Sequence, residues 1–225
     1  MELELKKECL DTYELGEPQT LTQEETAETI VPDYCPDIAR IISAEGVVCL
    51  HGGTEQDGVT GTVRVTVLYT PENESGVRAL EFAMPFSAQG EGLAGCAHVV
   101  VETEIELLES RMLNPRKIFT RCKLVTHLAG CRKVCLTISS DAETDPALLV
   151  EKRCCGQTVS LLRQVAEKDL TFSETMSLSL GREGAAELLH CRANGIVTET
   201  KAIGNKLIFK GVFLVSALYL SLIHI

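Results

Sequence analysis

Cysteine is the residue type that could do the most chemistry in this chain, because ten cysteines occur among its 225 residues. Thiolates bind zinc, form disulfides or attack substrates where spacing and surroundings allow it. The spacing is poor for zinc, since Cys131 and Cys135 are separated by three residues and no Cys-x-x-Cys occurs. The N-terminus carries no pattern typical of a secretory signal. We therefore expect the reducing cytosol, where disulfides are rare.

Most of the cysteines are then predicted to be small buried hydrophobes. Cys49, Cys122 and Cys135 fall within alternating strand-like patterns that favour this interpretation. Cys154 and Cys155 are adjacent, and neighbouring residues of a strand point to opposite faces. This pair is the best candidate for an exposed thiol.

Other catalytic patterns are missing from the sequence. It contains neither the Gly-x-Ser-x-Gly of a nucleophile elbow nor the glycine-rich motifs that bind phosphates and dinucleotides. Single histidines are scattered without metal-ligand spacing at His51, His98, His127 and His190. A nucleophile pair such as Cys122 with His127 stays open, because such partners meet only in the fold.

Glu102, Glu104 and Glu106 could resemble the paired carboxylates of general acid–base catalysis. Their spacing of two places all three on one face of a strand, opposite a face of apolar residues. A solvated strand face explains this pattern better than catalysis does. We predict no active site, no metal and no cofactor, and hence a protein that is not an enzyme.

The formal net charge of −11 narrows the possible partners. Binding to nucleic acid needs a basic face that releases counterions from phosphates. Anionic membrane surfaces likewise attract basic segments. We therefore expect no nucleic-acid partner and no membrane insertion.

One strand-like stretch organises the chain. Residues 61–69 alternate valines with Thr62, Arg64 and Thr66, which is typical of a half-buried strand. The stretch returns as residues 211–219, with the glycine and the tyrosine both displaced by 150 positions (211 − 61 and 219 − 69). Upstream, Glu-Thr at 25–26 returns at 174–175, and the glycine at 46 returns at 195, each displaced by 149. Such self-similarity predicts a duplicated structural unit.

The repeat divides the chain into two related antiparallel β modules, so the predicted fold class is mainly β with a minor α component. We expect a leading strand in residues 1–19, a first module in 20–140, a linker in 141–156 and an incomplete second module in 157–225. Each module is predicted to hold one short helix, at residues 33–42 and around 185–191. Pro36 and Asp37 suit a helix start, and the isoleucines at 38, 41 and 42 share one helical face. Strands are expected at 47–50, 61–69, 77–82, 99–107, 117–128, 134–138, 157–165, 169–172, 196–200 and 207–219.

Residues 211–225 are almost continuously apolar, which could suggest a membrane span. The counterpart at 62–69 alternates with polar residues and cannot span a membrane, so we predict a strand here as well. Val212, Leu214 and Ser216 stand where the first copy has its polar outer face. A strand that is apolar on both faces is normally packed against other elements on both sides. Nothing after it repeats residues 77–138, so we expect a truncated polypeptide whose last six residues are foreign to the protein. The uncovered strand is then a predicted site of self-association.

These motifs resemble those of a known family. The helix-like Pro-Asp-Ile segment, the strand ending in Leu-Tyr and the following Met-Pro-Phe are similar to the SPOCS domain of spore-coat morphogenetic proteins of endospore-forming Firmicutes, such as SipL and SpoVID. The second copy repeats the pattern from the lysine before its strand to the closing tyrosine. The residues that carry the resemblance are Pro36, Asp37, Ile38, Gly61, Leu68, Tyr69, Pro85, Phe86, Lys206, Gly211, Leu218 and Tyr219.

The resemblance implies a non-enzymatic scaffold of spore-coat or spore-envelope assembly, acting in the mother-cell cytoplasm at the forespore surface. Its implied partners are other coat morphogenetic proteins. Family members commonly carry a C-terminal LysM domain, for which this chain has no segment. Two alternatives stay open: a cell-wall glycan-binding module, with Tyr13, Tyr34 and Phe119 as the candidate aromatic platform, and an uncharacterised hydrolase or thiol enzyme.

Overall fold

A computed structural model of the chain describes residues 4–51, 58–143 and 186–221, together with 151, 153, 155–156, 158–166, 168, 171 and 173–175. The described residues form antiparallel β structure, which confirms the predicted mainly β class, and contain no helix. The strands are β1 (Glu4–Leu15), β2 (Gln19–Ile30), β3 (Ile38–His51), β4 (Gly58–Pro71), β5 (Arg78–Gln89), β6 (His98–Asn114), β7 (Lys117–Glu143), β8 (Ala186–Ile203) and β9 (Lys206–Ser221).

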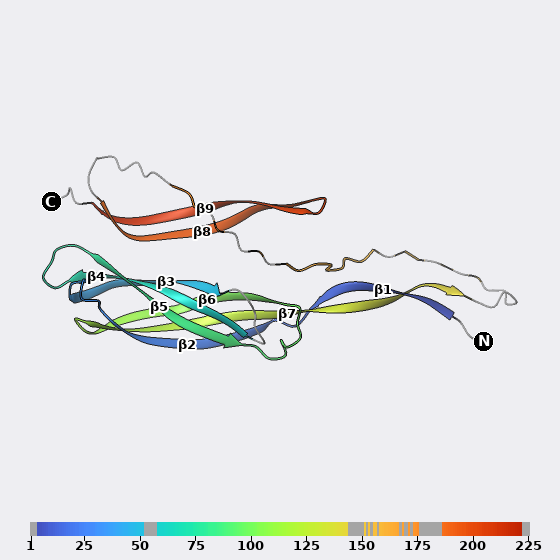
Figure 1. Cartoon of the computed structure of the whole chain (residues 1–225), viewed down its shortest axis with the longest axis horizontal. Coiled ribbons are helices and arrows are strands. Elements are labelled where there is room, and N and C mark those ends of the chain that lie inside the picture. Colours follow the sequence, from blue (N-terminus) through green and yellow to red (C-terminus); the bar gives the residue numbers. More distant parts are fainter. Residues whose placement is uncertain are drawn as a thin grey trace.

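Two sheets pack face to face in residues 4–143 (Figure 1). The first has the order β3-β4-β5. The second is built around β7, which pairs with β6 and with both β1 and β2. β1 and β2 follow one another along β7, and the break between them is bridged by a hydrogen bond of 2.8 Å from Gly16 N–H to the Gly130 carbonyl. Beyond the sandwich, β1 and the second half of β7 continue as a two-stranded ribbon.

The core lies between the two sheets and depends on the strand that organises the sequence. Val63, Val65, Val67 and Tyr69 of β4 are at most 1% exposed and pack against apolar residues of β7. The alternation predicted for residues 61–69 is therefore confirmed. The facing residues of β7 are Ile118, Cys122 and Leu124.

The helix predicted at residues 33–42 is wrong, because β3 already begins at Ile38. The register of β3 against β4 shifts between Ile38 and Arg40 and again between Ile41 and Ser43. A β-bulge places two residues of one strand opposite one residue of the other. It therefore turns Ile38 and Ile41 toward the same face at the spacing of three that resembled a helix.

The loop before β3 is held by tertiary contacts instead of helical ones. The Arg116 guanidinium donates to the carbonyls of Val31 and Cys35 at 2.8 Å and to the carboxylates of Asp33 and Asp37 at 3.0 Å. At a helix start, the carboxylates of Asp33 and Asp37 would instead have accepted from free backbone N–H groups. Long-range pairing outweighs local helix propensity here.

The helix predicted around residues 185–191 is also wrong, since residues 186–191 belong to β8 and pair with β9. The strand predicted at residues 157–165 is wrong for its described part, because residues 158–165 form no strand. Of the strand predicted at 169–172, only Thr171 is described, and it lies outside any strand.

The repeat relates the segments around residues 158–165 and Thr171 to strands of the first module. With the displacement of 149, β1 corresponds to residues 153–164 and β2 to residues 168–179 (4 + 149, 15 + 149, 19 + 149 and 30 + 149). β1 and β2 both pair with β7, and the described residues contain no counterpart of β7 in the second module. A strand-like pattern without a partner strand cannot satisfy its backbone groups as a sheet.

The observed boundaries refine the predicted domains. β1 belongs to the first module through its pairing with β7, and β7 extends to Glu143, into the predicted linker. Residues 144–150 of that linker and residues 222–225 of the tail lie outside the described residues. Pro85 lies within β5, which pairs only with β4 among the described strands, so its missing N–H is tolerated at a sheet edge. No helix long and apolar enough to cross a membrane occurs in the described part of the chain.

Candidate functional site

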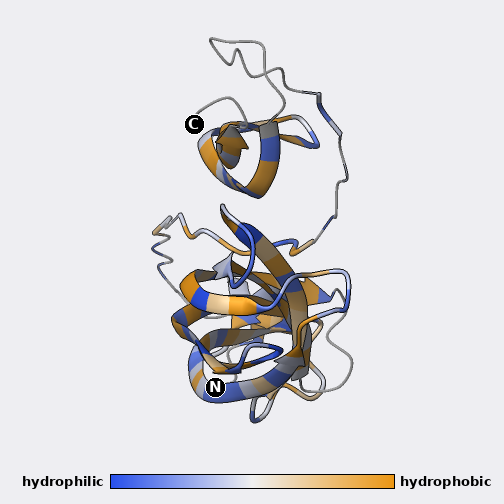
Figure 2. Ribbon diagram, turned by 90° about the vertical axis from the view of Figure 1, so that its left-hand side faces the viewer, coloured by the Kyte–Doolittle hydropathy of each residue, from blue (hydrophilic) through white to orange (hydrophobic). Residues whose placement is uncertain are grey.

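Among the residues that the structure describes, the β8–β9 hairpin exposes many large apolar side chains. Its strands join through a two-residue turn at Gly204 and Asn205, where a turn was predicted, and Gly204 has a φ of 60°. Glycine adopts that left-handed conformation without steric cost. The hairpin lies beside the sandwich (Figure 1), and Figure 2 shows it mainly in hydrophobic colours.

Both faces of β9 expose apolar side chains. Val212, Leu214 and Leu218 on one face are 50%, 57% and 47% exposed. On the other face Val215 and Tyr219 are 38% and 43% exposed. Soluble proteins rarely expose a contiguous apolar surface of this kind.

The repeat allows β9 to be compared directly with β4. Each is antiparallel to the preceding strand, with Gly46 opposite Val65 and Gly195 opposite Phe213. Val215 is the counterpart of Val65. If β8 and β9 kept the register of β3 and β4, Gly195 would therefore lie opposite Val215, so the observed register differs by two residues (215 − 213). A shift of two leaves every side chain on its face. The second hairpin therefore keeps the face pattern of the first.

The two strands differ in what surrounds them. β4 pairs with β3 on one edge and β5 on the other, and its inner face is buried. β9 pairs with β8 alone among the described strands. No second strand pairs with β9 in the part of the chain that the structure describes.

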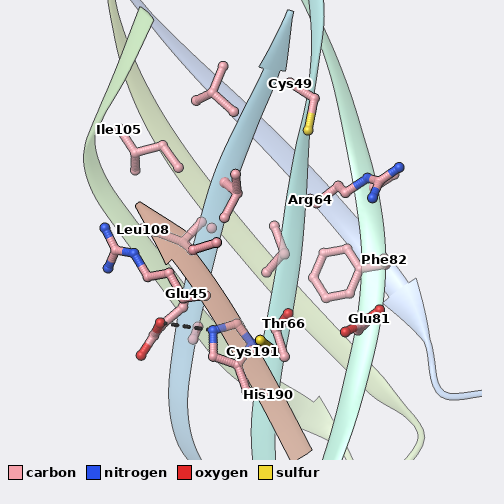
Figure 3. Close-up of a pocket in the computed structure, with 18 of the residues that line it drawn as sticks. Glu45, Cys49, Arg64, Thr66, Glu81, Phe82, Ile105, Leu108, His190 and Cys191 are labelled. Carbon is pink, nitrogen blue, oxygen red and sulfur yellow. Dashed lines mark ion pairs between the residues drawn. The ribbon is translucent and has the colours of Figure 1, made fainter. Parts of the chain in front are cut away.

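Two ionic contacts tie β8 to the sandwich. His190 Nε2 lies 3.2 Å from Glu45 Oε2, and Arg78 Nη1 lies 3.5 Å from Glu187 Oε2. The first contact is an ion pair only when the imidazole is protonated. Around it, a broad open depression of about 970 Å³ is lined by residues of β3, β4, β5, β6 and β8 (Figure 3). Arg64 and Glu81 are among its charged residues.

The cysteine and histidine candidates do not form a catalytic pair. Cys122 is fully buried, and burial, with a smaller contribution from Glu25, raises its pKa to about 11. His127 is exposed on the same strand, five residues further, and its Nδ1 lies 3.0 Å from Thr20 Oγ1. Residues five apart on a strand point to opposite faces. The hypothesis that Cys122 and His127 act together is therefore wrong.

The acidic strand face is solvated, as its spacing indicated. Glu102, Glu104 and Glu106 are all exposed on β6. Glu106 forms an ion pair of 2.8 Å with Lys123 of β7. The basic face of residues 117–128 thus lies beside the acidic face of β6.

The other cysteines take several environments. Cys9 and Cys135, whose Cα atoms are 5.7 Å apart across the β1–β7 ribbon, are joined as a disulfide, so the prediction of Cys135 as a free buried thiol is wrong. Cys49 is half-buried, and Cys155 is exposed. Cys154 lies outside the described residues. No group of His, Cys, Asp and Glu that could hold a metal occurs among the residues that the structure describes.

The aromatic candidates lie apart. Tyr13 is on β1, with its ring centroid 6.2 Å from that of His98. Tyr34 is 87% exposed in the loop before β3. Phe119 is on β7, where the Arg111 guanidinium lies 4.8 Å from the ring centroid. The structure does not bring the three together into one platform.

The residues of the family-like motif in the first module do come together. The Tyr69 hydroxyl donates to the Pro36 carbonyl at 3.3 Å, and Tyr69, Ile38 and Phe86 share the core. The Phe86 ring lies against Gly61, where a Cβ would clash with it. Asp37 contacts Arg116, and Pro85 lies on β5. Leu68 is 9% exposed.

In the second module, Lys206, Gly211, Leu218 and Tyr219 all lie on β9. A Cβ on Gly211 would approach the Ile196 carbonyl oxygen to 2.5 Å. Arg116, which organises the loop before β3, was missed by the sequence reasoning. Its position directly after the Asn-Pro turn was the only available signal.

Comparison with protein-family models, with curated proteins and with solved structures finds no match for this chain.

Proposed function

We propose that this protein is a non-enzymatic assembly module that binds other proteins through its β8–β9 hairpin, with the sandwich of β1–β7 as a rigid platform. One observation carries the proposal: β9 exposes apolar side chains on both faces. Interfaces are built around desolvated apolar and aromatic residues with a polar rim. Here Lys201, Lys210 and Glu199 near the turn supply such a rim.

The biological setting follows from the motifs of the first module. Their resemblance to the SPOCS domain supports a role in spore-coat or spore-envelope assembly, in the mother-cell cytoplasm at the forespore surface. The partners would be other coat morphogenetic proteins. The acidic net charge of −11 fits a protein partner better than a nucleic acid.

A pull-down from sporulating cells tests this function. The bait is the chain itself, and the matched control is a double variant, Leu214→Glu with Val215→Arg, which places one charge on each face of β9. We expect coat proteins to be retained by the wild-type chain and lost with the variant. Equal retention by both proteins would show that the hairpin is not the interaction surface.

A second candidate function has one observation in its favour. A depression of about 700 Å³ on the outer side of the β7 sheet is lined by Phe119, Arg111, Arg121 and Glu24. An aromatic ring beside charged side chains is the kind of surface that could bind a cell-wall glycan. Co-sedimentation with purified peptidoglycan tests it. A glycan-binding module should sediment, and Phe119→Ala should abolish sedimentation.

A further inference from the structure

The depression on the outer side of the β7 sheet combines side chains from neighbouring strands. In the ladder of β6 and β7, Arg111 lies opposite Phe119, and Glu109 lies opposite Arg121. Residues two apart on a strand point to the same face, so these four side chains share the outer face of the sheet. β2 adds Glu24. The volume of about 700 Å³ lies within the range of sites for small molecules.

The two arginines of the depression differ in their partners. Arg121 Nη2 lies 3.3 Å from Glu109 Oε2, and Arg121 Nη1 lies 3.8 Å from Glu24 Oε2. Arg111 is exposed and forms no ion pair with any residue that the structure describes. The charge of Arg121 is therefore balanced within the protein, whereas the charge of Arg111 is available to a ligand.

Phe119 positions Arg111 and does not offer that ring face to a ligand. The Arg111 guanidinium lies over the Phe119 ring, 4.8 Å from its centroid, so a sugar cannot stack on the same face. Attraction between the cation and the ring instead holds the guanidinium plane in place. A planar guanidinium binds a carboxylate through two parallel hydrogen bonds from its edge. The pair of Arg111 and Phe119 is thus suited to a carboxylate.

The two glutamates limit which carboxylate can bind. Glu24 and Glu109 are exposed, and carboxylates only accept hydrogen bonds, so they suit the hydroxyl groups of a sugar. They also repel further anions close to Arg111. The net charge of −11 opposes a polyanion in the same way at longer range. This arrangement favours a ligand with one carboxylate and several hydroxyl groups over an acidic polypeptide.

We infer that this depression binds a sugar acid, a glycan unit with one carboxylate, through the guanidinium of Arg111 supported by Phe119. The inference rests on the second candidate function, because it specifies the glycan unit that occupies the same depression. Bacterial cell walls contain such a unit. N-acetylmuramic acid differs from N-acetylglucosamine by a lactyl ether that carries the carboxylate, so the two sugars form a matched pair of probes.

The test measures the affinity of the whole chain for each sugar from the nuclear magnetic resonance shifts of backbone and arginine side-chain N–H groups. Lactate and poly-L-glutamate supply carboxylates without a sugar. We expect N-acetylmuramic acid to bind at least about tenfold more tightly than N-acetylglucosamine or lactate. Arg111→Gln should remove this preference. Lys123→Gln removes a positive charge from the same strand as Phe119 but outside the depression, and should change affinity by less than about threefold.

Two variants of Phe119 test its positioning role, and circular dichroism checks that the sheet is intact in every variant. Phe119→Leu keeps an apolar side chain without the aromatic face. It should weaken binding of N-acetylmuramic acid and leave that of N-acetylglucosamine unchanged. Phe119→Tyr keeps the ring and should retain the preference of the wild type. Equal loss of both sugars with Phe119→Leu would contradict the positioning role.

Equal affinity for the two sugars would overturn the inference, as would a preference that survives Arg111→Gln. Poly-L-glutamate that binds as tightly as N-acetylmuramic acid would make an acidic polypeptide the occupant and would also overturn it. If the protein sediments with peptidoglycan while the two sugars bind alike or not at all, the inference fails and the glycan-binding function stands. If neither the sugars nor peptidoglycan bind, both fail.

Discussion

Strands β4 and β9 carry the same spacing of glycine and tyrosine but lie in opposite environments. Tyr69 is fully buried, and burial together with the nearby Cys35 raises its pKa to about 12. Tyr219, its counterpart, is 43% exposed. The sequence pattern specifies a strand in both places. Whether that strand becomes core depends on its neighbours, and only β4 has neighbours on both edges among the described residues.

The outer faces of β4 and β9 differ in polarity. Thr62 and Arg64 give β4 a face that tolerates water, whereas Val212 and Leu214 give β9 a face that does not. β9 thus has fewer neighbouring strands than β4 among the described residues, although its surface is more apolar. This contrast supports a binding role for β9, and the following predictions test it from the largest expected effect to the smallest.

A matched pair of substitutions should separate the two strands most clearly. Val65→Arg buries an unpaired charge in the sandwich and should destabilise the protein by more than about 4 kcal/mol. Val215→Arg is at a half-exposed position and should change stability by about 0.5 kcal/mol or less. Urea unfolding followed by circular dichroism measures both. Similar losses for the two variants would mean that β9 is as buried as β4 in solution.

Self-association should depend on the presence of the β8–β9 hairpin. The sandwich of β1–β7 holds its own core, so residues 1–150 are expected to fold alone and to stay monomeric. The whole chain exposes β9 and should form larger species at the same concentration. Light scattering on both proteins checks this. If the whole chain is equally monomeric, the apolar face of the hairpin is covered in solution.

Much of the first module could be predicted from the sequence. Apolar and polar residues alternate along its strands, and these strands pair with one another within the module. The alternation of residues 61–69 and the acidic and basic faces of β6 and β7 are examples. The segment before β3 could not be predicted in this way. Local spacing cannot distinguish a bulged strand at Ile38 and Ile41 from a helical face, and the contacts of Arg116 arise only in the fold.

In the second module, the sequence pattern predicts a strand where the described residues form none. Residues 157–165 carry a strand-like pattern, but their described part forms no ladder. Two bonds hold this segment to β1: Tyr13 N–H and the Thr12 hydroxyl donate to the Leu162 carbonyl, at 2.8 and 3.0 Å. A period of two predicts an extended segment, whereas a sheet needs a partner, and partners are not encoded in the periodicity. The candidate site on β9 was indicated by composition, since its apolar residues on both faces are visible in the sequence.

Removing the Arg116 side chain should affect only the first module. Arg116→Ala leaves the carbonyls of Val31 and Cys35 and the carboxylates of Asp33 and Asp37 without this donor. We expect a loss of about 1–3 kcal/mol, because the bonds to the Val31 and Cys35 carbonyls and to the Asp37 carboxylate are partly buried, whereas the bond to the exposed Asp33 contributes little. Thermal unfolding measures the loss. Arg116→Lys should restore only part of it, since a single ammonium cannot reproduce the planar fork. An unchanged melting temperature would contradict the assigned role.

The buried Tyr69 and Cys122 predict a loss of stability at alkaline pH. Burial favours the neutral form of each, so their contributions are complete below the ordinary pKa values of 10.0 and 9.0. The contributions disappear as the pH rises through the folded-state values of about 12 and about 11. Melting temperatures of the wild type should therefore fall between pH 9 and pH 12. The variant Tyr69→Phe with Cys122→Ala should fall less steeply, and parallel curves would show that other groups cause the loss.

The smallest effects should come from the exposed ion pairs, and here the two modules should behave alike. Lys123 pairs with Glu106 at 2.8 Å in the first module, and Lys210 pairs with Glu199 at 3.1 Å in the hairpin. Contact with Lys201 and Lys210 lowers the pKa of Glu199, yet water screens the charges in both pairs. Lys123→Met and Lys210→Met should each leave stability nearly unchanged, and 1 M salt should erase any difference from the wild type. A larger, salt-resistant loss for Lys210→Met alone would mean that its end of the hairpin is shielded from water, which would place an occupant on β9 even in the isolated chain.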